Sequence, residues 1–168
     1  MEVRAIRAGE YERVGDLTVS AYSSIPGDHM SGGYESELRA VERRSIEADV
    51  LVAEREGGIV GGVTYVDDPV SPWAETEGLR PGEALIRMLA VDPVAQGTGA
   101  GRALLEACIE RAVDGGKRAL VLHTTPWMTT AHRLYESRGF RRLPDRDFLP
   151  LPDVPLMAYG VDLPPPVA

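Results

Sequence analysis

The stretch from Glu83 to Arg102 constrains the fold more than any other part of the sequence. It begins with a mostly apolar run of strand length that reaches Val91, and Asp92-Pro93 ends that run. A glycine-rich segment then opens a helix. A strand, a glycine turn and a helix N-terminus together predict an anion site, because the first amides of a helix have no partner within it and carry partial positive charge. The apolar positions of the predicted helix recur at helical spacing and are Leu104, Leu105, Cys108, Ile109, Ala112 and Val113.

The glycine pattern narrows the choice of phosphate ligand. A dinucleotide-binding fingerprint, G-x-G-x-x-G, counted from Gly97 requires glycine where this chain has Arg102. A P-loop requires Gly-Lys followed by Ser or Thr, and the sequence contains no such run. The pattern that is present is Q-x-x-G-x-G, formed by Gln96, Gly99 and Gly101.

With the run RMLAVDP (87–93) before it, this pattern resembles motif A of the GNAT family of N-acetyltransferases, which binds acetyl-CoA at this turn. The segment from Ala131 to Phe140 resembles motif B of the same family, whose core is A-x-x-L-Y-x-x-x-G-F. Together with a predicted hairpin upstream, the two motifs extend the resemblance over nearly the whole chain. The resemblance implies a single N-acetyltransferase domain over residues 1–163, followed by a proline-rich tail at 164–168.

Periodicity and turn residues predict elements in the order typical of that family. The predicted fold is α/β (α+β), the single-domain acyl-CoA N-acyltransferase fold, with a mixed, splayed β-sheet flanked by helices. Gly61 and Gly62 inside a predicted strand indicate a bulge or close packing by another segment. The predicted strands are 3–7, 49–54, 59–66, 83–91, 118–123, 140–143 and 155–163, the helices include 34–47 and 129–138, and the loops include 23–33, 67–82 and 145–154.

The resemblance implies how acetyl-CoA would bind as a cosubstrate. The strand that ends at Val91 would separate from its neighbour, so that the pantetheine arm adds to it like a further strand. That pairing would use the main chain of Leu89, Ala90 and Val91, with the Leu89 amide facing the thioester carbonyl. The pyrophosphate would lie on the amides of the glycine turn. The residues of that turn are Gln96, Gly97, Thr98, Gly99, Ala100, Gly101 and Arg102.

Tyr135 matches the tyrosine that, in many relatives, protonates the departing thiolate. A phenol with a pKa of about 10 can deliver a proton to a thiolate of similar basicity. The alternative is that Tyr135 packs in the core beside Leu134. Thr129 and Thr130, at the start of the same predicted helix, are interpreted as helix caps.

The general base is harder to predict. Relatives often carry glutamate at the position that here is Leu85, so this chain departs from the pattern. Glu83 lies two residues earlier, on the same face of the strand, and is the candidate base, directly or through a water. A strand-start surface charge is the alternative. Glu75 and Glu77, in the loop before the strand, are lesser candidates.

The other reactive side chains do not indicate a metal site. His29, His123 and His132 are not spaced as a ligand set, and His123 is interpreted as a structural residue. Cys108 falls in the apolar stripe of its helix, which indicates core packing rather than a covalent carrier. Relatives often have an asparagine that contacts CoA where this chain has Met128.

Charge and composition narrow the partners. The net charge of −8 over 168 residues argues against nucleic acid, and no apolar run reaches the length of a membrane span. One cysteine permits no internal disulfide, which fits a cytoplasmic location. The expected partner is a small-molecule or peptide amine, with a homodimer possible, and the acidic balance mildly favours a cation. A non-catalytic acyl-CoA-binding or regulatory module of the same fold is the alternative function.

Overall fold

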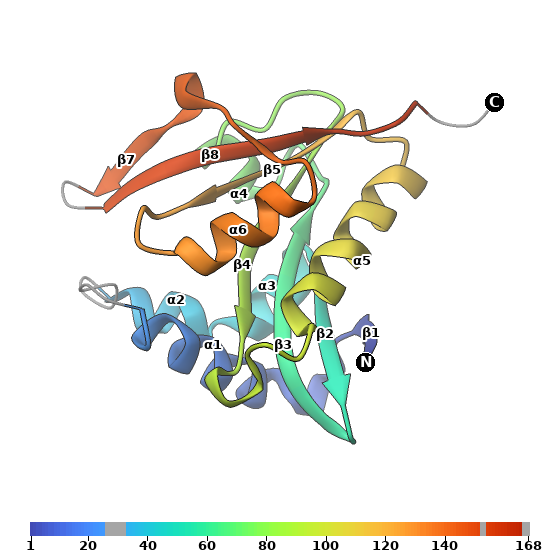
Figure 1. Cartoon of the computed structure of the whole chain (residues 1–168), viewed down its shortest axis with the longest axis vertical. Coiled ribbons are helices and arrows are strands. Elements are labelled where there is room, and N and C mark those ends of the chain that lie inside the picture. Colours follow the sequence, from blue (N-terminus) through green and yellow to red (C-terminus); the bar gives the residue numbers. More distant parts are fainter. Residues whose placement is uncertain (26–32, 152–153, 166–168) are drawn as a thin grey trace. The chain divides into compact units, whose positions relative to one another are not determined.

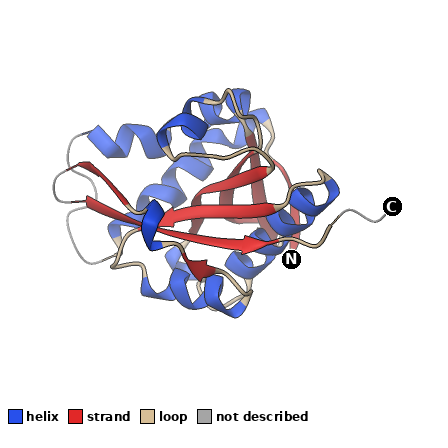
Figure 2. Cartoon of the chain, turned by 90° about the horizontal axis from the view of Figure 1, so that it is seen from above, coloured by secondary structure: helices blue, strands red, loops and turns tan. Residues whose placement is uncertain are grey.

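The computed structural model describes residues 1–25, 33–151 and 154–165. Most of the predicted loop at 23–33, with His29, and the end of the proline-rich tail lie outside the described residues. The described strands and helices form the mixed sheet flanked by helices that the sequence predicted (Figure 2). None of the helices in these ranges combines the length and the apolar character needed to cross a membrane.

The chain divides into two compact units, and each unit takes two stretches of sequence. Three elements contribute residues to both, namely β3 (Gly58–Val66), of which only Val66 lies in the second unit, β4 (Glu83–Val91) and α5 (Ala100–Asp114). The prediction of a single domain over 1–163 therefore stays a prediction. The first unit comprises Met1–Tyr65 and Met88–Cys108, and the second comprises Val66–Arg87 and Ile109–Ala168.

In the first unit, β1, β2 and β3 pair antiparallel in chain order (Figure 1). Glu56 and Gly57 have φ values of 53° and 79°, so the β2–β3 hairpin closes with the tight turn that such positive angles allow. This confirms the predicted hairpin. The unit contains β1 (Glu2–Ala5), the short helix η1 (Ala8–Glu10), α1 (Tyr11–Ser23), α2 (Tyr34–Arg39), α3 (Val41–Glu47), β2 (Asp49–Arg55), β3 (Gly58–Val66) and η3 (Pro93–Ala95), with parts of β4 and α5.

The core of the first unit forms where α1 lays its apolar face on the strands. Val14, Leu17 and Ala21 recur at helical spacing, so they share one face of α1 and are buried together. A Cβ placed on Gly61 would lie 3.0 Å from both the Ala90 carbonyl oxygen and a Leu104 methyl group, which confirms the close packing predicted for this glycine. The strand and helix residues in the same cluster are Val41, Val50, Val52, Ile59 and Ala90.

The predicted helix at 34–47 is wrong as one element. The backbone leaves helical geometry at Ala40 (φ −76°, ψ 50°), and α2 and α3 lie on either side of it. Leu38 and Val41 are fully buried, but Ile46 is 78% exposed. The break changes the direction of the chain, so the two halves no longer share one apolar stripe.

In the second unit, β4 and β5 run parallel, and β8 pairs antiparallel with β5, β6 and β7. Figure 1 shows β7 and β8 as a hairpin, side by side. Gly139, with φ 85°, follows the end of α6, as its position after the predicted helix implies. The unit contains α4 (Pro72–Thr76), β5 (Ala119–Thr124), α6 (Thr129–Ser137), β6 (Arg141–Arg142), the short helix η4 (Pro144–Arg146), β7 (Phe148–Leu151) and β8 (Val154–Asp162), with parts of β4 and α5.

Two segments that were predicted to be loops contain regular structure. The connection at 67–82 includes α4, where the Ser71 hydroxyl accepts a hydrogen bond from the Trp73 amide and Pro72 follows at the first position. A cap residue followed by proline is a helix-start signal that the sequence carried. The segment at 145–154 includes β7, whose sequence FLPL has a proline that made it resemble a loop.

The packing at Gly61 gives a stability prediction. Gly61→Ala should lower the free energy of unfolding by about 1–3 kcal/mol, because the added methyl group overlaps backbone and core atoms that cannot move freely. Gly9→Ala is the matched control, since a Cβ there meets nothing within 4 Å. Urea unfolding followed by circular dichroism measures both variants, and equal stabilities would contradict the packing argument.

Candidate functional site

The pairing of β4 with β5 stops partway along β4. The parallel ladder joins Glu83–Ile86 to Ala119–Leu122, although β4 itself continues to Val91. Met88 has a φ of 52°, a left-handed conformation that is uncommon for a residue with a side chain. A residue in that conformation interrupts the regular pleat of a strand, so the end of the ladder has a local physical cause. The predicted separation of this strand from its neighbour stays a prediction, and nothing in the sequence identified Met88.

The turn after β4 is held by a charged pair within the first unit. The Asp92 side chain accepts a hydrogen bond from the Val94 amide (3.1 Å) and so caps η3. The Arg13 guanidinium lies 2.7 Å from the other oxygen of Asp92 and also donates to the Ile59 carbonyl. The Arg13 hydrogen bond holds the pKa of Asp92 below its usual range. The entry to the glycine turn is thus tied to both α1 and β3.

The glycine turn is open where the sequence placed the pyrophosphate. Gly97 and Gly99 have φ values of 79° and 91°, and a Cβ on either would meet nothing within 4 Å. The first i→i−4 bond of α5 runs from the Ala103 amide to the Gly99 carbonyl (2.9 Å). The amides of Ala100, Gly101 and Arg102 precede it, so they have no acceptor within the helix. Residues 96–99 and Arg102 are exposed, and Ala100 is buried.

Tyr135 lies on α6 and is 5% exposed. Its ring centroid is 5.8 Å from that of Phe140 and 6.2 Å from that of Tyr159, so it belongs to an aromatic cluster of the second unit. The helix-cap interpretation of Thr129 and Thr130 is wrong, because the N-cap residue of α6 is Met128 and no side chain caps this end.

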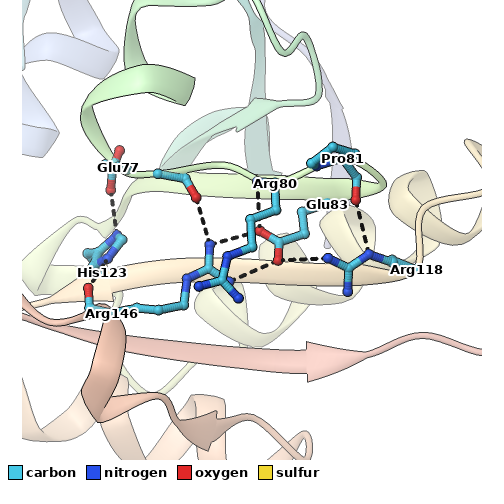
Figure 3. Close-up of polar contacts among 8 residues, drawn as sticks. Glu77, Arg80, Pro81, Glu83, Arg118, His123 and Arg146 are labelled. Atoms are coloured by element: carbon cyan, nitrogen blue, oxygen red, sulfur yellow. Dashed lines mark hydrogen bonds and ion pairs between the residues drawn. The ribbon is translucent and has the colours of Figure 1, made fainter.

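Glu83 lies at the centre of a buried ionic network (Figure 3). Arg146 donates to both of its carboxylate oxygens, at 2.9 and 2.8 Å. Arg118 donates at 3.3 Å, and the Arg80 amide at 3.1 Å. The Glu83 side chain is 3% exposed and the Arg146 side chain 9%. Each oxygen of Glu83 therefore already accepts from more than one donor.

These contacts argue against the general-base role predicted for Glu83. Burial by itself raises the pKa of Glu83, but the hydrogen bonds from Arg146 and the Arg80 amide outweigh it, and the pKa lies below its usual range. A carboxylate with a lowered proton affinity and filled acceptor positions is a poor proton acceptor. Leu85, where relatives often have glutamate, is fully buried in the core.

Glu77 and His123 form a second buried contact beside this network (Figure 3). The Nδ1 atom of His123 lies 3.0 Å from a Glu77 oxygen, and Nε2 lies 3.2 Å from the Arg146 carbonyl oxygen. Both partners are acceptors, so the two contacts are hydrogen bonds together only when the imidazole carries both protons. The side chain of His123 is 2% exposed, which agrees with the structural role predicted for it.

Arg146 and Arg87 are the functional candidates that the sequence did not reveal. Arg146 reaches Glu83 from 63 residues further along the chain, and its Nη2 also donates to the Gly78 carbonyl oxygen (3.0 Å). Arg87 lies in β4 with its guanidinium over the Trp73 ring, 5.1 Å from the ring centroid. No spacing rule links such distant residues. Within the described ranges, no group of three or more histidine, cysteine or acidic side chains is arranged to bind a metal ion.

Comparison with known proteins gives a family match. A profile described as "Acetyltransferase (GNAT) family" matches residues 16–140. A mycothiol acetyltransferase from Cellulomonas flavigena is 38% identical over 97 residues, which cover 56% of this chain and 27% of that protein. Another, from Sanguibacter keddieii, is 31% identical over 143 residues, covering 84% of this chain and 44% of that protein. The chain thus spans less than half the length of these curated relatives.

A solved structure shares the fold. The structure of yncA from Salmonella typhimurium with its cofactor acetyl-CoA matches with a TM-score of 0.69 and 19% identity. The match covers 100% of this chain and 96% of that one. At this identity the likeness shows the fold.

The Glu83 network gives a prediction with a pH dependence. Glu83→Gln should lower the free energy of unfolding at pH 7 by about 3–5 kcal/mol, because it leaves the Arg146 guanidinium buried without its carboxylate. Arg141→Gln, which breaks a pair whose partners are 78% and 81% exposed, should change it by at most about 1 kcal/mol.

The pKa of Glu83 is lowered in the folded protein, so the stability contributed by its ionised form is present above the unfolded pKa of about 4.3. That contribution is lost as the pH falls from there through the folded pKa. The difference between wild type and Glu83→Gln should therefore narrow below about pH 4 in urea-unfolding experiments. A difference that stays constant down to pH 2.5 would show that the network does not work through this charge.

Proposed function

Because the chain belongs to the acetyltransferase (GNAT) family, we propose that it transfers an acetyl group from acetyl-CoA to an amine by direct attack in a ternary complex. The observation that carries the proposal is the open glycine turn before α5, where Gly97 and Gly99 have positive φ values and nothing lies within 4 Å of the position a Cβ would take. Such a turn suits a diphosphate, since it offers N–H donors and the positive end of a helix. The related structure described with acetyl-CoA supports the choice of ligand.

The chain's own residues have separate roles in this proposal. The main chain of Leu89, Ala90 and Val91 pairs with the pantetheine arm, and the Leu89 amide stabilises the negative charge that develops on the thioester oxygen. The residues from Gln96 to Arg102 bind the pyrophosphate. Tyr135 donates its phenolic proton to the sulfur as the carbon–sulfur bond breaks and the new carbon–nitrogen bond forms.

The attacking amine must lose a proton to become a nucleophile. Glu83 was the predicted acceptor of that proton, but its oxygens are occupied by Arg146, Arg118 and the Arg80 amide. We therefore assign proton acceptance to a water molecule and give Glu83 a positioning role, in which it holds Arg146 against β4. The acceptor is an amine of a small molecule or peptide, and a cytoplasmic location and a homodimer remain parts of the proposal.

Gly99→Asp tests the diphosphate site. The substitution should weaken CoA binding at least roughly 100-fold in isothermal titration calorimetry, because a carboxylate then lies among the amides that bind the diphosphate. Gly57→Asp is the matched control, since Gly57 also has a positive φ (79°) and open space around it but lies in the β2–β3 turn. Unchanged CoA affinity in folded Gly99→Asp would reject the proposed function.

Tyr135→Phe tests the acid. It should lower kcat for thiol release by about 100-fold and leave KM for acetyl-CoA nearly unchanged, because the hydroxyl acts only as the thiolate forms. Tyr159→Phe removes a hydroxyl from the same aromatic cluster and should change kcat little. If wild-type protein binds CoA but acetylates no amine in a broad panel, the alternative function, a non-catalytic acyl-CoA-binding module, is the correct one.

A further inference from the structure

Arg87 is a partly exposed side chain with a guanidinium N–H donor that has no acceptor in the described part of the chain. Its Nε lies 2.8 Å from a Glu77 oxygen, an ion pair without the alignment of a hydrogen bond. Its Nη1 is buried and donates to no acceptor among the described residues. The side chain nevertheless keeps 21% of its surface exposed. A buried donor without an acceptor is unfavourable, so such a group needs an explanation.

The other arginines of the same network are satisfied. Both terminal nitrogens of Arg146 donate, to Glu83 and to the Gly78 carbonyl oxygen. Arg118 donates to Glu83 and to the Pro81 carbonyl oxygen, and 58% of its side chain is in solvent. Arg87 therefore differs from these two arginines in having a buried donor without an acceptor.

Arg87 also shares its carboxylate partner. Among the described residues it pairs with Glu77, and an oxygen of Glu77 lies 3.0 Å from the Nδ1 atom of His123. The nearby Glu83 offers Arg87 no second carboxylate, because Arg146 and Arg118 already occupy it.

The surroundings hold Arg87 in one place. Trp73, on α4, lies under its guanidinium, and Glu77 follows the same helix. Both belong to the connection at 67–82, which leads directly into β4. In β4, Arg87 precedes by two residues Leu89, the residue proposed to face the thioester. A guanidinium that is stacked on an aromatic ring and ion-paired at Nε is restrained in position, and its planar set of N–H donors suits a carboxylate.

We propose that Arg87 binds a carboxylate of the acceptor, so that the acceptor is an amino acid, with the amine that is acetylated and the carboxylate in one small molecule. This inference rests on the proposed function and deepens it by naming the substrate class. It also refines the preference for a cation drawn from the net charge, since an amino acid presents both signs of charge.

The kinetic test compares a panel of amino acids with their carboxamides, each pair at equal concentrations of neutral amine. Acetyl-CoA-dependent thiol release should show a kcat/KM about 10- to 100-fold higher for the acids, the range expected for a hydrogen bond to a charged group. Arg87→Gln should remove the preference by lowering the rates of the acids alone. Arg118→Gln, in the same network but exposed, should retain it. Equal rates for acids and carboxamides with the wild-type protein would overturn the inference and leave the proposed function standing.

A purely structural role for Arg87 predicts a different kinetic result. Arg87→Gln would then lower the rates of acids and carboxamides equally, which overturns the inference. Arg87→Lys keeps the charge beside Glu77 but loses the fork, and it should retain only part of the preference. Melting temperatures and circular dichroism confirm that each variant is folded, and the lysine variant serves if the glutamine variant is not.

A binding experiment keeps the inference testable if no amine is acetylated. Calorimetry with CoA present should show an N-acetylated amino acid binding at least about 10-fold more tightly than its carboxamide, and Arg87→Gln should abolish the difference. Absence of turnover with this result rejects the proposed function and retains the carboxylate site. Equal affinity of acid and carboxamide, or no binding of either, rejects the carboxylate site.

Discussion

The rest of the structure depends on where β4 stops pairing with β5. The ladder is regular through Ile86, and Met88 then takes a left-handed conformation that a strand does not continue through. The backbone beyond Met88 consequently has hydrogen-bonding groups that β5 does not use. A strand with unused groups, followed by a glycine turn, is what an extended ligand with a diphosphate requires. The proposed catalytic chemistry follows from this one irregularity.

Ionic interactions of Glu83 hold the beginning of β4 in place. Glu83 is removed from water, and its ionised form is tolerated because Arg146 binds both of its oxygens. Removing one partner of such a buried pair is expected to lower the free energy of unfolding far more than removing an exposed pair. The network therefore explains why a glutamate at the candidate position for a base is better suited to hold β4 and the η4 segment together. Its neighbour Arg87 is the residue that we propose binds a carboxylate of the ligand.

Much of the fold was predictable because its signals are local. The apolar spacing of Leu104, Leu105 and Cys108 predicted a face of α5 that is buried, and the turn at Glu56 and Gly57 lies where the hairpin was predicted. The errors arose where a local signal was weak or misleading. No feature of the sequence around Ala40 predicted the break between α2 and α3. The proline of β7 suggested a loop, although pairing with β8 makes the segment a strand.

The sequence by itself determined the family, the mixed sheet with its flanking helices, and the position of the glycine turn between Val91 and Ala103. These follow from residues close together in the chain, where glycine permits positive φ and apolar periodicity selects strand or helix. Only the tertiary structure shows the contacts of Glu83 and Arg87. Glu83 pairs with Arg146, 63 residues away, and Arg87 lies against a helix inside a predicted loop. Strand pairing decides which side chains come into contact in a buried cluster, and no local pattern in the sequence predicts those contacts.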